Sequence, residues 1–186
     1  MYYQEEIQRY IPLNEQEICD RERMLWLAAQ YGESLLTREN TVAHFTASAF
    51  VVDRSREQTL MVYHNIYQSW SWTGGHADGD SDLFRTAERE LCEETGLRSF
   101  QPLMKTAAAL DILTVQGHVR RGKYIGAHLH LNLSYLFEAS PELHLRIKPD
   151  ENSGVQWLNI AKLGSLCGEP HMMPIYNKLI DQARNL

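Results

Sequence analysis

Three glutamates in one predicted helix are the side chains of this chain best placed to do chemistry. Segment 82–95 reads as a helix, and at about 100° per residue Glu90, Glu94 and Glu93 fall near −20°, +20° and −80° from the first apolar residue. The carboxylates therefore overlap or adjoin the apolar stripe instead of the solvent-facing side. The stripe consists of Leu83, Phe84, Ala87 and Leu91. Burying like charges together is costly unless a cation neutralises them, so the pattern predicts a site for a positive ion.

The residues around these glutamates narrow the chemistry. Carboxylate oxygens are hard ligands, and a site without thiolates suits Mg²⁺ or Mn²⁺. Arg89, next to Glu90, is expected to hold a carboxylate through a forked ion pair. Gly74 and Gly75 are expected to form a tight turn whose bare backbone can approach an ion or a phosphate. Together these features indicate metal-assisted phosphoryl or pyrophosphoryl chemistry.

The elements that must position this helix read as strand-rich. The clearest strand is 127–139, where leucines on one face alternate with His128 and His130 on the other. The other predicted elements are strands at 46–52, 59–64, 69–72 and 155–158, one or two strands within 101–115, and a last helix over 174–184. This layout predicts an α/β fold in which helices cover a mixed sheet.

Residues 1–41 read as a helical extension of a main domain over 42–186. Asn14 followed by Glu17 is an Asn variant of the capping box, and Gly32 is the expected stop. Apolar residues recur at helical spacing between these two signals, namely Ile18, Met24, Leu25, Ala28 and Ala29. We expect this arm to dock on the main domain.

The composition is that of one ordinary globular domain. Of the 186 residues, 44% are hydrophobic and 23% charged, no apolar run approaches a membrane span, and the first residues lack the pattern of a signal peptide. The net charge of −6 disfavours extended contact with duplex nucleic acid. Cys19, Cys92 and Cys167 show no CxxC spacing, which favours a reducing compartment. We therefore expect a cytoplasmic protein.

The segment from Gly75 to Leu97 resembles the signature box of the Nudix (MutT-like) hydrolases. That box reads Gly, five residues, Glu, seven residues, Arg-Glu-aliphatic, one residue, Glu-Glu, one residue, Gly-aliphatic, and eight of its nine fixed positions match. The flanking strands extend the likeness to about 42–163. The resemblance implies a Nudix-type α/β/α sandwich with a mixed β-sheet, preceded here by the helical N-terminal arm.

The one departure is Ser81, which stands where the box has its upstream Glu. Asp78, Asp80 and Asp82 surround it, so a carboxylate from a neighbouring position is a candidate replacement. Their spacing also invites a calcium-loop interpretation, which fails because Leu83 and Arg89 occupy positions that need Gly and Glu. The loss of the box Glu bears on the rate and on the number of metal ions.

The resemblance also implies roles for individual residues. The metal ligands would be Glu90, Glu93, Glu94 and the carbonyl of Gly74, with Arg89 orienting the cluster. Either Glu90 or Glu94, or a carboxylate outside the box, would activate the water. Glu151 is the best-placed outside candidate, and its alternative interpretation is a solvated loop acid.

Several other residues are candidate substrate contacts, each with a plainer alternative. Trp72 could stack a base, although aromatic residues at strand ends are often core. Arg120 and Arg121 could grip a phosphate or ribose, or belong to a solvated loop. The histidines His76, His128 and His130 complete this set, with a surface position as the alternative for the two strand histidines.

The expected function is metal-dependent hydrolysis of a pyrophosphate bond in a nucleoside diphosphate linked to another moiety. The expected cofactor is Mg²⁺, with Mn²⁺ as a second possibility. The expected partner is a small nucleotide-type or pyrophosphate substrate, and no membrane partner is expected. A catalytically weak domain that binds a nucleotide metabolite as a sensor is the alternative, motivated by Ser81. An isopentenyl-diphosphate isomerase is disfavoured because 42–75 contains no cysteine. Either a monomer or a homodimer fits the sequence.

Overall fold

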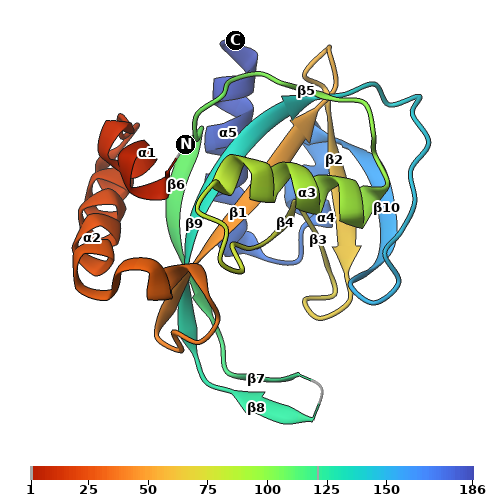
Figure 1. Cartoon of the computed structure of the whole chain (residues 1–186). Coiled ribbons are helices and arrows are strands. Elements are labelled where there is room, and N and C mark those ends of the chain that lie inside the picture. The colour runs from red at the N-terminus through yellow and green to blue at the C-terminus, as the bar shows by residue number, and fades with distance from the viewer. Residues whose placement is uncertain (1, 121) are drawn as a thin grey trace.

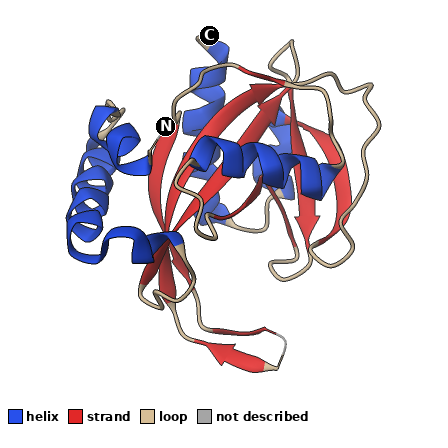
Figure 2. Cartoon of the chain, viewed as in Figure 1, coloured by secondary structure: helices blue, strands red, loops and turns tan. Residues whose placement is uncertain are grey.

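An eight-stranded mixed sheet between helices forms the body of the protein, as the computed structural model shows for residues 2–120 and 122–186 (Figures 1 and 2). Its strands are β1 (Ala43–Val52), β2 (Gln58–His64), β3 (Ser69–Ser71), β4 (Thr73–His76), β5 (Gln101–Pro102), β6 (Ala109–Val115), β9 (His128–Glu138) and β10 (Asn152–Asn159). The main path runs β10-β2-β1-β9-β5, with β3 on β2, β4 on β1 and β6 on β9. Strands β1 and β9 are parallel, whereas β1 pairs antiparallel with β2 and β4.

Helices cover both faces of this sheet, as expected. They are α1 (Tyr3–Arg9), α2 (Glu15–Tyr31), α3 (Leu83–Thr95), α4 (Leu163–Leu166) and α5 (Met173–Arg184), with short 3₁₀ turns at Gly32–Leu36, Ile160–Lys162 and Pro170–Met172. Helix α3 crosses one face and α5 lies behind the other (Figure 1). The predicted α/β sandwich with a mixed sheet is confirmed.

Strand β1 is buried along its whole length, but its two faces differ. On the face toward α3, Phe45, Ala47 and Ala49 join Leu131 and the apolar stripe of the helix. On the opposite face, core packing begins only at Phe50, beside α5. The earlier part of that second face carries polar side chains, which form part of the site.

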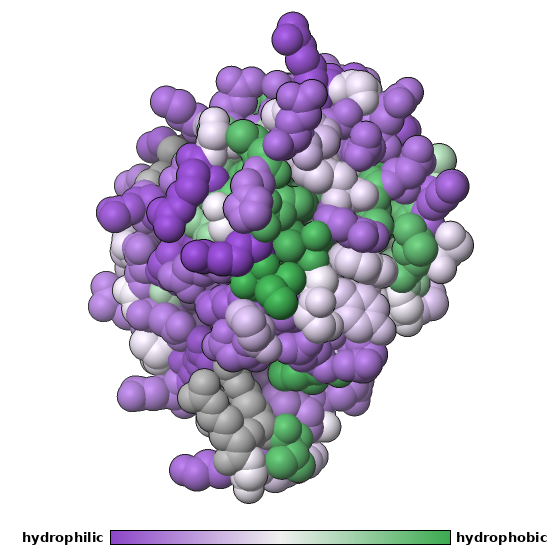
Figure 3. All heavy atoms as spheres, turned by 90° about the vertical axis from the view of Figure 1, so that its right-hand side faces the viewer, coloured by the Kyte–Doolittle hydropathy of each residue, from purple (hydrophilic) through white to green (hydrophobic). Residues whose placement is uncertain are grey.

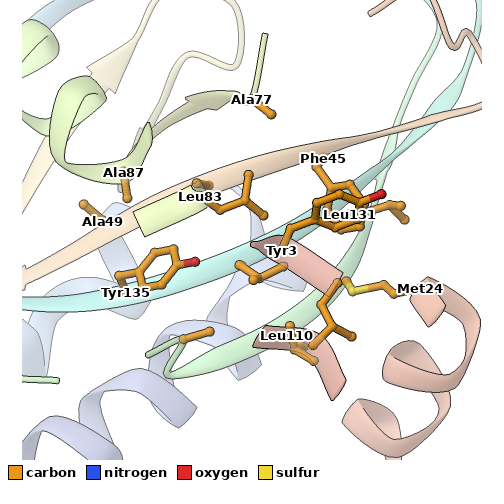
Figure 4. Close-up of a cluster of buried hydrophobic side chains, with 14 of the residues drawn as sticks. Tyr3, Met24, Phe45, Ala49, Ala77, Leu83, Ala87, Leu110, Leu131 and Tyr135 are labelled. Atoms are coloured by element: carbon orange, nitrogen blue, oxygen red, sulfur yellow. The ribbon is translucent and has the colours of Figure 1, made fainter. Parts of the chain in front are cut away.

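The N-terminal helices pack into the first core. Tyr3 and Met24 are fully buried, and Figure 4 shows them beside Phe45 and Leu131. Glu6 is also buried, where it accepts hydrogen bonds from the Tyr135 hydroxyl at 2.9 Å and from a backbone N–H at 2.8 Å. The arm is therefore held by buried polar contacts as well as by apolar packing.

The predicted limits of the long N-terminal helix are confirmed. Asn14 caps α2 by accepting the Glu17 backbone N–H at 2.9 Å, and Gly32 ends the helix at φ +54°. The Glu17 side chain accepts from the backbone N–H of Leu13 instead of closing the reciprocal box on Asn14. Glu17 is fully buried and paired with Lys178 of α5 at 2.6 Å, which ties the arm to the other end of the chain.

The buried stripe of this helix runs through Met24, Leu27 and Ala28, whereas Ile18 and Ala29 are exposed. Sequence reasoning also missed one structural element, a hairpin. Strands β7 (His118–Arg120) and β8 (Lys123–Ile125) form a hairpin that projects from the body (Figure 1) where sequence reasoning expected only a basic loop. The Arg121 prediction lies outside the described residues, as does the side chain of Arg120.

The side of the molecule that carries β2 and β10 is mainly hydrophilic, with a hydrophobic patch near its middle (Figure 3). Among the described residues, no helix combines the length and apolarity that crossing a membrane requires.

Candidate active site

Gly75 sets the distance between β4 and α3. A Cβ on this residue would lie 2.4 Å from Cδ of Glu90 and 2.6 Å from Oε1 of Glu90, closer than real Cβ contacts allow. The expected glycine turn is wrong, because Gly74 and Gly75 lie within β4, paired with Ser48 and Ala47 of β1. Gly75 serves the close approach of α3 to β4, whereas a Cβ on Gly74 would meet Ala47 and Ser48 of β1. Asp78, at φ +47°, lies in the turn that follows.

Glu94 is the most deeply buried acid of the site, with 3% of its surface exposed. Its Oε1 accepts the Gly74 N–H at 2.8 Å, and its backbone carbonyl accepts Nδ2 of the buried Asn152 at 3.0 Å. Burial, reinforced by the negative charges of Glu90 and Glu151, raises the pKa of Glu94 to about 8. A cation bound at this point would stabilise the charged carboxylate.

Glu90 lies one turn earlier on the same face of α3, with its side chain 12% exposed. Burial raises its pKa, although the neighbouring Arg89 guanidinium opposes that shift. Nη2 of Arg89 donates both to Glu90 Oε1 at 3.1 Å and to the His76 carbonyl oxygen at 3.2 Å. Arg89 therefore bridges helix and strand through a single nitrogen, and the expected two-pronged fork onto one carboxylate is wrong.

Glu151 completes the cluster from the loop before β10. Carboxylate oxygens of Glu90, Glu94 and Glu151 all lie within 4.8 Å of one another. The backbone N–H groups of Glu151 and Asn152 both donate to the Lys148 carbonyl, at 2.9 and 2.8 Å, so a tight turn presents the Glu151 side chain. The structure thus brings together the two helix residues and the loop acid that sequence reasoning had chosen separately.

Glu93 lies apart from this group of three. Its side chain is 47% exposed, and its Oε2 pairs with Nζ of Lys148 at 3.1 Å. Lys148 also contacts Glu151 at 3.2 Å. Partial burial disfavours the ammonium, but the hydrogen bonds that Lys148 donates to these two carboxylates outweigh burial and raise the pKa of Lys148.

The carboxylate cluster fits a hard divalent cation. Its donors are all oxygens, two of its three side chains are largely buried, and like charges crowd within 4.8 Å. Such a donor set suits Mg²⁺ or Mn²⁺. Glu90 and Glu94 are the buried residues that would hold the ion, with Glu151 beside them and Glu93 close by on α3.

No acid near Ser81 joins this cluster among the residues that the structure describes. Asp78 forms a two-pronged ion pair with Arg38, with both contacts at 2.9 Å. Asp80 accepts the Asp82 N–H at 2.9 Å, and Asp82 caps α3. The three aspartates that surround Ser81 therefore stabilise the loop and the start of the helix.

A polar stripe covers part of the sheet face opposite α3. Asn132 of β9 accepts from the hydroxyls of Thr46 at 2.9 Å and Ser48 at 2.8 Å, and donates to the Ser134 hydroxyl at 3.0 Å. All four side chains are buried. Sequence reasoning missed Thr46 and Ser48, although their period-2 spacing in an otherwise apolar run was a usable signal.

Four histidines stand at the end of this stripe. The predicted His76, His128 and His130 gather around His44, which sequence reasoning missed, with ring centroids 4.8–5.1 Å apart. His130 lies on the face of β9 opposite the leucines, as predicted, and it pairs with His44 in the β1–β9 register. The alternation of His44 with Thr46 and Ser48 was the sequence signal.

Trp72 packs edge-on against Tyr176 of α5, with ring centroids 5.3 Å apart. Its ring is partly buried against the second core. Trp70 packs edge-on against Tyr63, at 5.4 Å, on the neighbouring strand. A stacking role for Trp72 stays a prediction.

Comparisons with known proteins agree with this architecture. A family model described as the NUDIX domain matches residues 42–179. Among solved structures, the chain is similar to a C. elegans Ap4A hydrolase in a binary complex, with TM-score 0.58 and 14% identity over 76% of this chain and 98% of that chain. It is also similar to the E. coli dihydroneopterin triphosphate pyrophosphohydrolase, with TM-score 0.57 and 13% identity over 74% of this chain and 92% of that chain.

A third similar structure is the NUDIX domain of Shewanella oneidensis NrtR complexed with ADP ribose, with TM-score 0.53 and 16% identity over 83% of this chain and 97% of that chain. A search of curated proteins found no match. At these identities the solved structures speak for the fold alone. The family model, which covers most of the chain and contains the carboxylate cluster, decides the family. The chain belongs to the Nudix hydrolase family.

Proposed function

We propose that this protein hydrolyses a pyrophosphate bond in a nucleoside diphosphate linked to another moiety, and that it depends on Mg²⁺ or Mn²⁺. The observation that carries the proposal is the convergence of Glu90, Glu94 and Glu151 from two separate elements, with oxygens within 4.8 Å. A buried cluster of like charges has little structural value without a cation, which supports a built metal site.

The burial of the three acids suggests how their roles divide. Glu94 and Glu90 are the more buried, so they hold the cation, together with the carbonyl of Gly74. When bound, the cation stabilises negative charge on the phosphate oxygens. Glu151, with 34% of its side chain exposed, accepts the proton of the attacking water. Arg89 fixes Glu90 against β4 and so keeps the cluster in register.

Glu93 completes the ligand set in this proposal. In the structure Glu93 is paired with Lys148, so its exposed side chain would have to leave that ammonium to hold the cation. Lys148 then keeps its contact with Glu151 and orients the base.

The substrate class rests on the similar structures and on candidate contact residues outside the carboxylate cluster. The three similar structures are an Ap4A hydrolase, a dihydroneopterin triphosphate pyrophosphohydrolase and a domain complexed with ADP ribose, and each of these compounds joins a phosphate chain to a ring system. We propose that Trp72, Arg120, Arg121 and the histidines His76, His128 and His130 contact the parts of the substrate that flank the scissile bond. A cytoplasmic location and a monomeric or homodimeric state remain predictions from composition.

The test is a panel of nucleoside diphosphate derivatives incubated with Mg²⁺ or Mn²⁺ while phosphate or nucleotide release is measured. Glu94→Gln serves as the blank, and Glu88→Gln, on the same helix but outside the cluster, is the matched control. We expect metal-dependent turnover of at least one compound by the wild type and by Glu88→Gln only. Equal turnover by wild type and Glu94→Gln would exclude the proposal.

A sensor that binds a nucleotide metabolite without turnover is the second candidate. Ser81 at the position of the box Glu favours it, and none of the neighbouring aspartates reaches the cluster. The similar NrtR domain was crystallised with ADP ribose. Tight metal-dependent binding of one compound, with no turnover of any, would replace the hydrolase proposal with this one.

A further inference from the structure

The histidine cluster lies on the other face of the sheet from the carboxylates. His44 of β1, His130 of β9 and His76 of β4 come from three adjacent strands, with β1 in the middle. One ring nitrogen from each lies within 4.8 Å of the other two. Three imidazoles delivered by rigid strands to one point form a preorganised ligand set.

The ring of His44 is oriented as metal ligands usually are. Its Nδ1 lies 3.1 Å from the backbone carbonyl of Asn40, so Nδ1 carries the proton that is donated and Nε2 presents a lone pair. His44 is only 4% exposed, and its Nε2 is buried with no hydrogen-bond partner. A buried acceptor without a partner costs about 1–3 kcal/mol, so the fold has a reason to fill this position.

His130 repeats the same feature. Its Nε2 is also buried without a hydrogen-bond partner. The amide of Asn132, two residues along the same face of β9, is already engaged with Thr46, Ser48 and Ser134. Two orphaned ring nitrogens therefore point to a group that lies outside the protein chain.

The donor atoms of this group select the kind of ligand. The hydrogen bond at Nδ1 leaves Nε2 of His44 as an acceptor, and Nε2 of His130 is buried beside it. Neutral imidazoles attract a phosphate weakly, but they are strong ligands for borderline divalent metals. The absence of thiolates and carboxylates from this group disfavours Mg²⁺ and Ca²⁺.

We propose that His44, His76 and His130 form a second metal site, distinct from the carboxylate cluster, that binds Zn²⁺ with a fourth position open to solvent or to a substrate oxygen. Three histidines and one open position match the pattern of zinc sites that exchange their fourth ligand. If the substrate reaches this site, it would contact the zinc ion instead of the side chains of His76 and His130. The proposal rests on the histidine geometry and does not depend on the hydrolase activity.

The first test uses wild-type protein with any affinity tag removed, in excess Mg²⁺ so that the carboxylate cluster is saturated. Zn²⁺ is titrated against a chromophoric chelator, and X-ray absorption is recorded on the zinc-loaded sample. We expect one Zn²⁺ per chain with three imidazole nitrogens at about 2.0–2.1 Å. Replacement by Co²⁺ should give the intense visible bands of a tetrahedral ion. No binding under these conditions, or an all-oxygen octahedral shell, would overturn the proposal without any variant.

Variants then locate the ion. His44→Ala and His130→Ala should each weaken Zn²⁺ binding about 100-fold or more, since disturbing even an outer partner of a metal ligand costs about 10- to 100-fold. His144→Asn and His171→Asn remove exposed histidines outside the group and should leave zinc affinity unchanged. Circular dichroism checks that each variant is folded.

A variant in the carboxylate cluster supplies the complementary control. Glu94→Gln should keep Zn²⁺ binding while it loses the response to Mg²⁺. Zinc binding that disappears in Glu94→Gln and persists in His44→Ala would assign the ion to the carboxylates and refute the histidine site. A protein that binds zinc as proposed but hydrolyses nothing would leave this inference standing while the proposed function fails.

Discussion

The carboxylate cluster and the histidine cluster both adjoin the short strand β4, on opposite faces of the sheet, and burial has opposite consequences for them. Gly75 of β4 faces α3 and lets Glu90 approach, whereas His76, the next residue, joins His44 and His130. Burial favours the uncharged form in both places: it raises the pKa of Glu94 to about 8 and lowers the pKa of His130 to about 2.

The consequence for metal binding differs between the two regions. An uncharged carboxylic acid must lose its proton before it can hold a cation, so the proposed metal ion would have to displace the proton of Glu94. An uncharged imidazole is already a ligand. The comparison teaches that one physical effect, desolvation, can prepare a site for a hard or for a borderline metal according to the side chain that it acts on.

The largest expected effect is a crossed loss of metal responses. Glu94→Gln should lower turnover about 100- to 1000-fold, the range seen when one electrostatic stabiliser of a transition state is removed, while zinc affinity stays. His44→Ala should lower zinc affinity while turnover stays. Steady-state kinetics and zinc titration on both variants measure the pattern, with Glu88→Gln as control. If each variant lost both responses, the two clusters would have to be treated as one site.

Gly75→Ala should reduce turnover about 100-fold, because the new Cβ would overlap Glu90 and displace it by roughly 1 Å. Gly126→Ala is the matched control, since a Cβ there has nothing within 4 Å. The measurement is kcat with Mg²⁺, together with the thermal unfolding midpoint to separate misplacement from unfolding. Full activity in Gly75→Ala would show that α3 tolerates a looser contact with β4.

The stability of the metal-free protein should fall as pH rises from about 4.5 to about 8. Glu94 has a pKa near 8 in the folded chain and 4.5 as its ordinary value, so the folded state holds an extra proton in this window and that stability is lost as pH rises through 8. Thermal unfolding between pH 5 and 8.5 measures the slope.

Two controls sharpen that measurement. Glu94→Gln should flatten the slope, because the amide does not titrate, and Mg²⁺ should raise the unfolding midpoint most at the alkaline end by binding the charged folded state. A slope that is identical in wild type and Glu94→Gln would assign it to other groups.

The smallest expected effect is that of Lys148→Met. Lys148 pairs with Glu93 and Glu151, but its side chain is 25% exposed. Partly exposed pairs contribute about 0.2–1 kcal/mol, so kcat should change by about 1.5- to 5-fold. Zinc affinity should not change, since Lys148 is absent from the histidine group. A change in zinc affinity would reveal coupling between the two faces.

The sequence alone predicted the features that depend on neighbours along the chain. Glu90 and Glu94 share one face of α3 because helix geometry places residues four apart side by side. The cap at Asn14, the stop at Gly32 and the alternation of leucines and histidines in β9 follow from equally local rules. The oxygen donors of the cluster, and hence the choice of a hard metal, were readable in the same way.

Tertiary structure decided what depends on residues far apart in the chain. Glu151 reaches Glu94 only because β10 and its preceding turn lie beside α3, and His44 meets His130 only through the register of β1 on β9. Gly75 was interpreted as a turn residue because the sequence does not show whether a glycine serves a turn or a close contact until the opposing side chain is known. Local periodicity shows which residues share a face, but strand register and burial, which set the contacts and the pKa values, arise from packing of the whole chain.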